Sequence, residues 1–349
     1  MNQTLSRRRF LALSSLASLG VVTSGYANSF RFWADKPNSK FKGVQIGVIT
    51  YSYRSMPHDL DQLIKFCVES GVSALELMGD PAEEYAGKPK PPFRMGPPPG
   101  GRPPAAPAAG TPAASPPQRP QMTDEQRAQM AEYNKKVAEW RSTVSMDKFV
   151  EIRKKLKDAG LSVYAFKPNA FGPNNSDAEV EYGMKAAKAL GATSVTLELP
   201  TDPAQTQRLG DLGAKHKVYV GYHNHLQATD TLWDNALNQS PYNSINFDCG
   251  HYLAAGGKNT KETLMAFIEN KHTRISTMHL KDRTTPANGQ KNLEWGKGDT
   301  PIKEMLTMIR DRKYKFPVTI ELEYNVPEGS DAVKEVAKCV VFAKNILES

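Results

Sequence analysis

The segment SVTLELPTDPAQTQRLGDLGAKHKVYVGYH, residues 194–223, contains the repeating unit that decides the fold. Both of its ends, 194–199 and 218–223, are short apolar runs with β-branched residues, as expected of strands buried in a parallel sheet. Between them, residues 203–216 are predicted to form a helix. The segment therefore predicts one strand–helix–strand unit of an α/β fold.

The same alternation continues on both sides of this segment. Further strands are predicted at 44–49, 74–77, 162–166, 245–248, 275–280 and 318–323, and further helices at 59–70, 146–159, 177–190, 231–239, 260–270, 301–312 and 331–347. Eight such units in one chain favour a closed (β/α)₈ TIM barrel over an open doubly wound sheet. No glycine-rich phosphate-binding fingerprint follows the first strand, which also disfavours the open sheet.

The chain has 349 residues, more than the roughly 250 that such a barrel typically needs. Residues 88–120, after the second strand, contain about half of the 25 prolines, with Ala and Gly between them. This composition predicts a disordered insertion, and the polar segment 123–140 behind it is expected to be a helical extension. The barrel domain is assigned to residues 43–349, with a tether at 28–42.

The N-terminus has the features of an export signal. SRRRFL at 6–11 fits the twin-arginine consensus, an apolar stretch follows at 11–22, and 25–27 offers small residues for cleavage. We therefore expect residues 1–27 to engage the twin-arginine translocase and the mature chain to be periplasmic or otherwise exported. About a dozen apolar residues are too few to span a bilayer comfortably, so no stable membrane anchor is expected. Three widely spaced cysteines do not indicate a disulfide framework.

The charge distribution argues against nucleic acid as a partner. The formal net charge is +8, but the leader and the proline-rich stretch together contribute eight basic residues and no acidic ones. The remainder is neutral overall, which does not support a surface that follows phosphates.

Polar side chains gather where the later predicted strands end. They are Glu198, His223, His225, Asp248, His251, His279, Lys281, Glu321 and Glu323. In a barrel these positions face the mouth, where active sites lie, and residues two apart on a strand share a face. Buried carboxylates are costly unless a cation compensates them. A mixture of carboxylates and imidazoles suits one divalent metal ion: Mn²⁺, Zn²⁺, Co²⁺ or Mg²⁺.

Five motifs occur in an order that resembles the xylose-isomerase-like barrels, a superfamily that includes sugar phosphate isomerases and epimerases. They are GYHNH (221–225), FDCGH (247–251), HLKD (279–282), GKGD (296–299) and IELEY (320–324). The resemblance extends from Gly43 to the C-terminus outside the insertion. It implies a single metal with ligands from strands five to eight, of which Asp248, His279 and Glu321 match three.

The fourth ligand is open between Glu198 and His223. Glu198 is preferred because it keeps three carboxylates around a hard cation, which would leave His225 for the substrate or for proton transfer. The resemblance implies that Glu321 is both ligand and acid/base, with Glu198 or His223 on the other side of the substrate.

The expected activity is a sugar isomerase or epimerase that transfers a proton through an enediolate of a small carbohydrate. His225, His251 and Lys281 are candidates for binding sugar hydroxyls. Trp295 either stacks on a sugar face or anchors a loop. Glu76 is expected either to line the pocket or to pair with a neighbouring strand.

Three other functions stay open at this point. A dehydratase or lyase acting on a keto-sugar or keto-glycoside would use the same metal for β-elimination. An apurinic endonuclease shares the fold, but its third metal needs a histidine where this chain has Leu293-Glu294-Trp295-Gly296. A non-catalytic sugar-binding protein would use the proline-rich insertion as its working part. The sequence leaves a homo-oligomer as an open alternative to a monomer.

Overall fold

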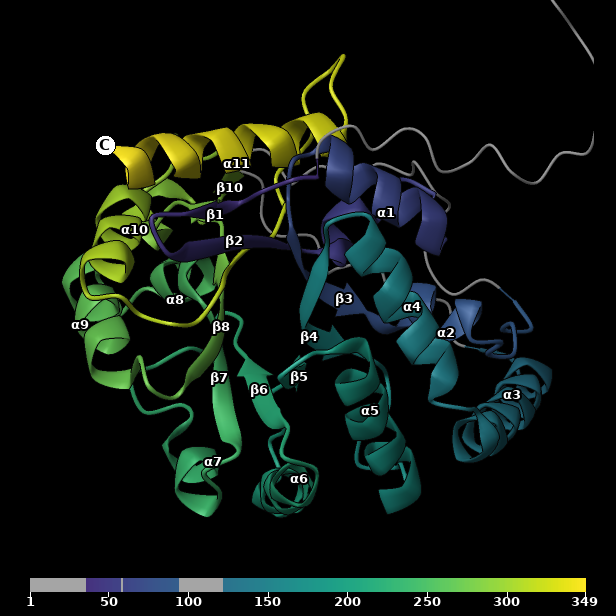
Figure 1. Cartoon of the computed structure of the whole chain (residues 1–349). Coiled ribbons are helices and arrows are strands. Elements are labelled where there is room, and N and C mark those ends of the chain that lie inside the picture. The colour runs from purple at the N-terminus through teal and green to yellow at the C-terminus, as the bar shows by residue number, and fades with distance from the viewer. Residues whose placement is uncertain (1–35, 58, 94–121) are drawn as a thin grey trace, which may run out of the picture. The chain divides into compact units, whose positions relative to one another are not determined.

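The computed structural model describes residues 36–57, 59–93 and 122–349. In this part of the chain eight parallel strands form a closed barrel in the order β2-β11-β8-β7-β6-β5-β4-β3, and β3 pairs back to β2 (Figure 1). The strands are β2 (Val44–Ile49), β3 (Ala74–Met78), β4 (Ser162–Lys167), β5 (Ser194–Glu198), β6 (Tyr219–His223), β7 (Asn243–Asp248), β8 (Ile275–Leu280) and β11 (Val318–Ile320). The predicted (β/α)₈ barrel is confirmed.

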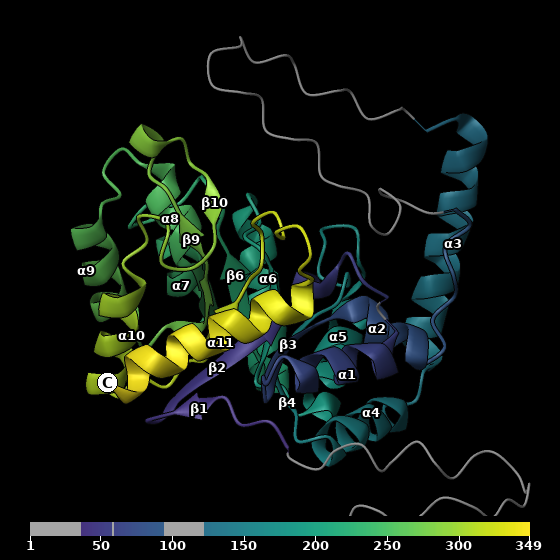
Figure 2. The same cartoon turned by 90° about the horizontal axis from the view of Figure 1, so that it is seen from above.

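Helices follow the strands and lie around the barrel (Figures 1 and 2). They are α1 (Leu60–Glu69), α2 (Gly79–Tyr85), α3 (Asp124–Thr143), α4 (Asp147–Asp158), α5 (Asp177–Leu190), α6 (Pro203–His216), α7 (Asp234–Gln239), α8 (Cys249–Ala255), α9 (Lys261–Lys271), α10 (Ile302–Asp311) and α11 (Ala332–Glu348). A short β1 (Lys40–Phe41) pairs antiparallel with β2. β9 (Asp282–Arg283) and β10 (Asn292–Leu293) form a small antiparallel ladder beyond β8.

Local sequence explains why several helix boundaries match the prediction. α5 begins in a capping box between Ser176 and Glu179 and ends at Gly191, whose φ of 87° is the left-handed conformation that glycine adopts without strain. α6 begins behind Asp202, which accepts a hydrogen bond from the helix, with Pro203 in the first turn.

Other boundaries differ from the prediction for identifiable reasons. β11 ends at Ile320 instead of residue 323, because the Leu322 amide donates to the hydroxyl of Ser52 at 3.0 Å and leaves the ladder. α8 was not predicted. It is a short helix that begins directly at the end of β7, where the Asp248 carboxylate accepts from the His251 amide at 2.7 Å.

The barrel also contains a partly buried tyrosine, Tyr164 on β4. The Tyr164 hydroxyl lies 2.8 Å from the hydroxyl of Thr319 on β11, which is separated from β4 by two strands of the barrel. A Cβ at Gly47 would lie 2.5 Å from the Tyr164 ring, so only glycine leaves the ring its space. Polar groups therefore continue into the barrel below its mouth.

The leader and most of the proline-rich insertion lie outside the described residues and stay predictions. Lys88, at the start of the predicted insertion, is nearly buried and contacts Asp80 at 2.9 Å and Glu83 at 2.7 Å. Among the residues that the structure describes, no helix is both long and apolar enough to cross a membrane.

Candidate active site

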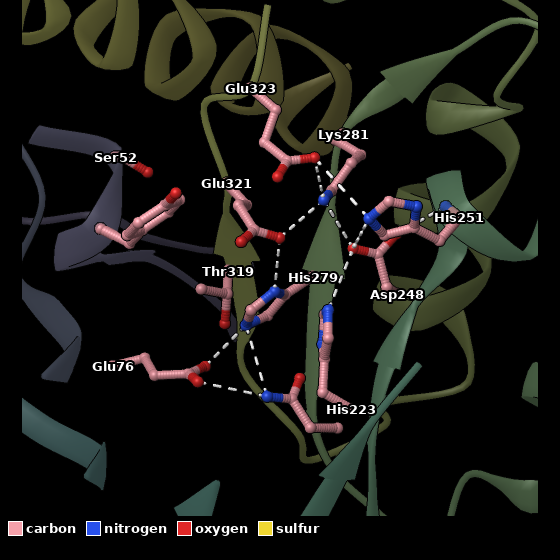
Figure 3. A network of polar contacts seen from close by, with 12 residues as sticks. Ser52, Glu76, His223, Asp248, His251, His279, Lys281, Thr319, Glu321 and Glu323 are labelled. Atoms are coloured by element: carbon pink, nitrogen blue, oxygen red, sulfur yellow. Dashed lines mark hydrogen bonds and ion pairs between the residues drawn. The ribbon is translucent and has the colours of Figure 1, made fainter. Parts of the chain in front are cut away.

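Four buried side chains meet at the carboxyl ends of consecutive strands (Figure 3). His223 ends β6, Asp248 ends β7, His279 lies near the end of β8, and Glu321 directly follows β11. Each offers one ligand atom, and these four atoms all lie within 4.8 Å of one another. Parallel strand pairing produces this geometry. Asp248 on β7 is in register with His279 on β8. His279 is also in register with Thr319 on β11, and Glu321 follows two residues later.

The electrostatic environment sets different protonation states in this group. Burial is the main reason that the pKa of His223 is lowered far below its usual value, so its imidazole is neutral. Burial alone would raise the pKa of Glu321, but Lys281 and His279 hold it well below the usual range. Burial raises the pKa of Asp248, against the opposing effect of Lys281. The site thus contains a neutral imidazole and a firmly ionised carboxylate.

Lys281 lies among the acidic side chains of the site. Its ammonium is 2.8 Å from Oδ2 of Asp248 and 2.7 Å from Oε2 of both Glu321 and Glu323. Burial would lower the pKa of Lys281, but these three carboxylates raise it, so the side chain stays charged. Lys281 was expected from the sequence as a candidate for binding sugar hydroxyls; in the structure its ammonium also offsets the negative charge of these three carboxylates.

Glu76 is fully buried and lies on the opposite side of the His279 ring from Glu321 (Figure 3). Its Oε1 accepts from Thr196 at 2.7 Å and from Asn246 at 3.2 Å, and its Oε2 lies 2.8 Å from Nε2 of His279. On the other side of the same ring, Nδ1 lies 2.8 Å from Oε2 of Glu321. Burial alone would lower the pKa of His279, but the two carboxylates raise it to about 10.

His251 is held by an arginine that the sequence analysis did not assign to it. Nη1 of Arg283 lies 2.6 Å from Nδ1 of His251. A guanidinium can only donate, so Nδ1 accepts and, in the neutral ring, Nε2 carries the proton. Burial and the charge of Lys281 lower the pKa of His251 to about 3, so the ring is neutral. Its Nε2 lies 3.7 Å from Glu323 and 4.0 Å from Asp248.

Glu198 and His225 form a separate pair nearer to solvent. Both side chains are about half exposed, and Nε2 of His225 lies 2.9 Å from Oε2 of Glu198. Lys167 contacts the other oxygen of Glu198 at 3.0 Å. The hydrogen bond that His225 donates to Glu198 raises the pKa of this imidazole above its usual value. Glu198 is therefore already paired with two basic groups, and it is not one of the four clustered side chains.

Trp295 and Cys249 are both buried. The indole of Trp295 is nearly buried and packs edge-on against Phe342 with ring centres 6.1 Å apart, which corresponds to the loop-anchor alternative. Cys249 is fully buried, with its thiol 3.2 Å from the carbonyl oxygen of His279.

A divalent cation fits the four-residue group. His223, Asp248, His279 and Glu321 supply two imidazoles and two carboxylates, a donor set typical of such ions. Nδ1 of His223 is buried without a hydrogen-bond partner among the described residues, and Nε2 of that ring faces Oδ2 of Asp248 at 3.8 Å. A second group consists of His223, His225 and His251, each of which has one ring nitrogen within 4.8 Å of those of the other two. That second group suits a cation less, because the free nitrogen of His251 carries a proton.

The chain belongs to the xylose isomerase-like TIM barrel family, whose model matches residues 121–341. No curated protein matches its sequence.

Solved structures share the fold at low sequence identity. D-psicose 3-epimerase from Clostridium cellulolyticum H10, solved with D-tagatose, is 11% identical with a TM-score of 0.52, over 87% of this chain and 100% of that one. A 3-keto-D-glucoside 4-epimerase from E. coli is 10% identical (TM-score 0.52, 86% and 99%). A probable 3-DHS dehydratase from Bacillus anthracis is 15% identical (TM-score 0.52, 85% and 97%).

Proposed function

We propose that this protein is an enzyme that binds one divalent metal ion and moves a proton next to the carbonyl of a carbohydrate, as a sugar isomerase or epimerase. The observation that carries this proposal is the group of four buried metal-ligand side chains at the barrel mouth. Membership of the xylose isomerase-like family supports it.

We assign His223, Asp248, His279 and Glu321 as the ligands. The sequence alone favoured Glu198 over His223 for the fourth position. The geometry supports His223, because its neutral ring lies in the cluster whereas Glu198 is half exposed and paired with Lys167 and His225. When bound, the cation would polarise the substrate carbonyl and stabilise the negative charge that develops on its oxygen.

The side chains around the ligands divide the remaining work. Lys281 keeps Glu321 ionised at neutral pH, so this carboxylate can accept the proton from the carbon next to the carbonyl. The contact with Arg283 orients the neutral ring of His251, so its Nε2–H can donate a hydrogen bond to a sugar oxygen.

The pair of Glu198 and His225 supplies the second acid/base group. Because Glu198 raises the pKa of His225, this imidazole carries a proton over a wider pH range than a free histidine. It is half exposed and therefore accessible to a substrate in the mouth. A proton returned from this side would complete an epimerisation.

The same pair also makes elimination the second candidate. A protonated His225 can donate to a leaving group, which turns the same initial proton removal into a dehydratase or lyase reaction. The structural neighbours include both epimerases and a probable dehydratase.

Incubation of the metal-loaded protein in D₂O with free ketoses and with 3-keto-glycosides separates these outcomes. Incorporation of deuterium at the carbon next to the carbonyl is followed by NMR. If an epimer or isomer appears together with this exchange, the result supports the isomerase or epimerase. Release of the aglycone supports elimination. Retention of every C–H proton in the presence of Mn²⁺, Mg²⁺, Co²⁺ and Zn²⁺ would refute both.

A further inference from the structure

Glu76 is a buried carboxylate that the proposed reaction does not use. It is fully buried, and it comes from β3, which is separated from β8 by two strands of the barrel. Its contacts reach Thr196 on β5, Asn246 on β7 and His279 on β8, so it connects side chains across the barrel interior. It lies outside the group of four ligand side chains.

The hydrogen bonds of Glu76 decide which nitrogen of His279 keeps its proton when the other nitrogen gives up its own to bind a metal ion. Thr196 and Asn246 donate to Oε1, and the remaining oxygen, Oε2, lies 2.8 Å from Nε2 of His279. Because the amide nitrogen of Asn246 can only donate, the carboxyl of Glu76 acts as an acceptor in this network. A buried carboxylate left without this bond would be costly, so Nε2 has to donate.

The other nitrogen of the ring is thereby directed to the proposed metal site. Nδ1 of His279 lies 2.8 Å from Oε2 of Glu321, on the side of the ring away from Glu76 (Figure 3). A carboxylate that accepts from one nitrogen of a histidine orients the ring and makes the other nitrogen a better ligand.

We propose that Glu76 is a positioning residue that holds His279 with Nε2–H directed into the barrel and Nδ1 directed to the metal, and that it thereby sets the affinity of the site for a divalent cation. This inference rests on the proposed metal-binding function. It adds a role for a residue of the second barrel strand that touches neither the metal nor the substrate.

Two measurements test the proposal independently. The first uses metal-free protein labelled with ¹⁵N-histidine. The Nε2–H proton of His279 should give a strongly downfield, slowly exchanging NMR signal that is lost or shifted upfield in Glu76→Gln. The second is the Kd for Mn²⁺ from isothermal titration, which should rise about 10–100-fold in the same variant.

Glu83→Gln is the matched control. Glu83 is also a fully buried glutamate with charged partners, Lys88 at 2.7 Å and Arg141 at 3.9 Å, but it lies on α2 away from the site. It should leave both the imidazole signal and the Kd unchanged. If Glu76→Gln does not fold, Glu76→Asp keeps the charge but is one methylene too short for Nε2, and it should show the same two effects.

The outcomes separate this inference from the proposed function. The positioning role is overturned if neither Glu76→Gln nor Glu76→Asp changes the imidazole NMR signal or the Kd for Mn²⁺. Equal losses in Glu83→Gln also overturn it, because they would reflect general destabilisation. Failure of the wild-type protein to bind any divalent cation refutes the proposed metal site, while the NMR signal still decides whether Glu76 orients His279.

Discussion

Replacing Lys281 with methionine should destabilise the protein strongly and make its stability depend on metal. The ammonium lies within 2.8 Å of Asp248, Glu321 and Glu323, and only 3% of its side chain is exposed. Methionine preserves most of the side-chain volume but leaves buried carboxylates facing one another. Removing one partner of a buried ion pair typically costs about 3–5 kcal/mol, so we expect a loss of this size in the free energy of unfolding at neutral pH.

A divalent cation should recover much of this loss, because it can replace the missing positive charge. Binding at one hundred times the Kd adds about 2.7 kcal/mol to the stability of any protein that binds only when folded. The variant should gain more than the wild type, since metal no longer competes with the ammonium for Asp248 and Glu321. The assay is urea denaturation of both proteins with and without Mn²⁺.

The deficit should also depend on pH. Burial already raises the pKa of Asp248, and loss of Lys281 raises it further. A carboxyl whose pKa is raised in the folded state destabilises the fold by a constant amount above that pKa. The deficit should therefore shrink as the pH falls through the folded-state pKa of Asp248 towards its unfolded-state value.

Lys297→Met is the matched control. Lys297 forms an ion pair with Glu294 at 2.8 Å, but 62% of its side chain is exposed. Such surface pairs contribute about 0–1 kcal/mol. A loss in Lys281→Met no larger than in Lys297→Met, or an equal gain from Mn²⁺ in variant and wild type, would refute the reasoning.

Three further predictions concern other parts of the chain. Glu198→Gln should lower the pKa of His225 towards about 6.5, which ¹H NMR titration of the ring measures. An unchanged titration midpoint would show that Glu198 and His225 do not pair. His223→Ala should weaken Mn²⁺ binding at least tenfold in isothermal titration and Glu198→Ala should change it less than threefold; the reverse order would restore Glu198 as the fourth ligand. Lysine in place of both Arg7 and Arg8 should retain the chain in the cytoplasm of a bacterial host, measured by cell fractionation, and unaltered export would exclude the twin-arginine route.

The sequence was sufficient for the barrel because its signals are local. Alternating apolar runs and helix caps such as Ser176, Asp202 and Gly191 depend on neighbours in the chain, and these boundaries agree with the structure. The short helix α8 was not predicted, because the Asp248 carboxylate that caps it was interpreted only as a metal ligand.

The candidate site was predictable in position but less so in pairing. Strand ends identified Asp248, His279 and Glu321, which the structure brings together. The partners of Glu76 and Lys281 were not predictable, because they join strands that are far apart in sequence, and no local pattern encodes which charges face each other across a barrel.

The tight fit of Tyr164 over Gly47 has a consequence for redesign of the barrel. A Cβ at position 47 would meet the tyrosine ring at 2.5 Å and the backbone oxygen of Ala74 at 2.9 Å, so a smaller residue at 164 relieves only part of the crowding. A library that aims to enlarge the space beneath the active site should therefore keep Gly47 and vary position 164. Its members lose the hydrogen bond of the tyrosine to Thr319, so they should be screened for stability first.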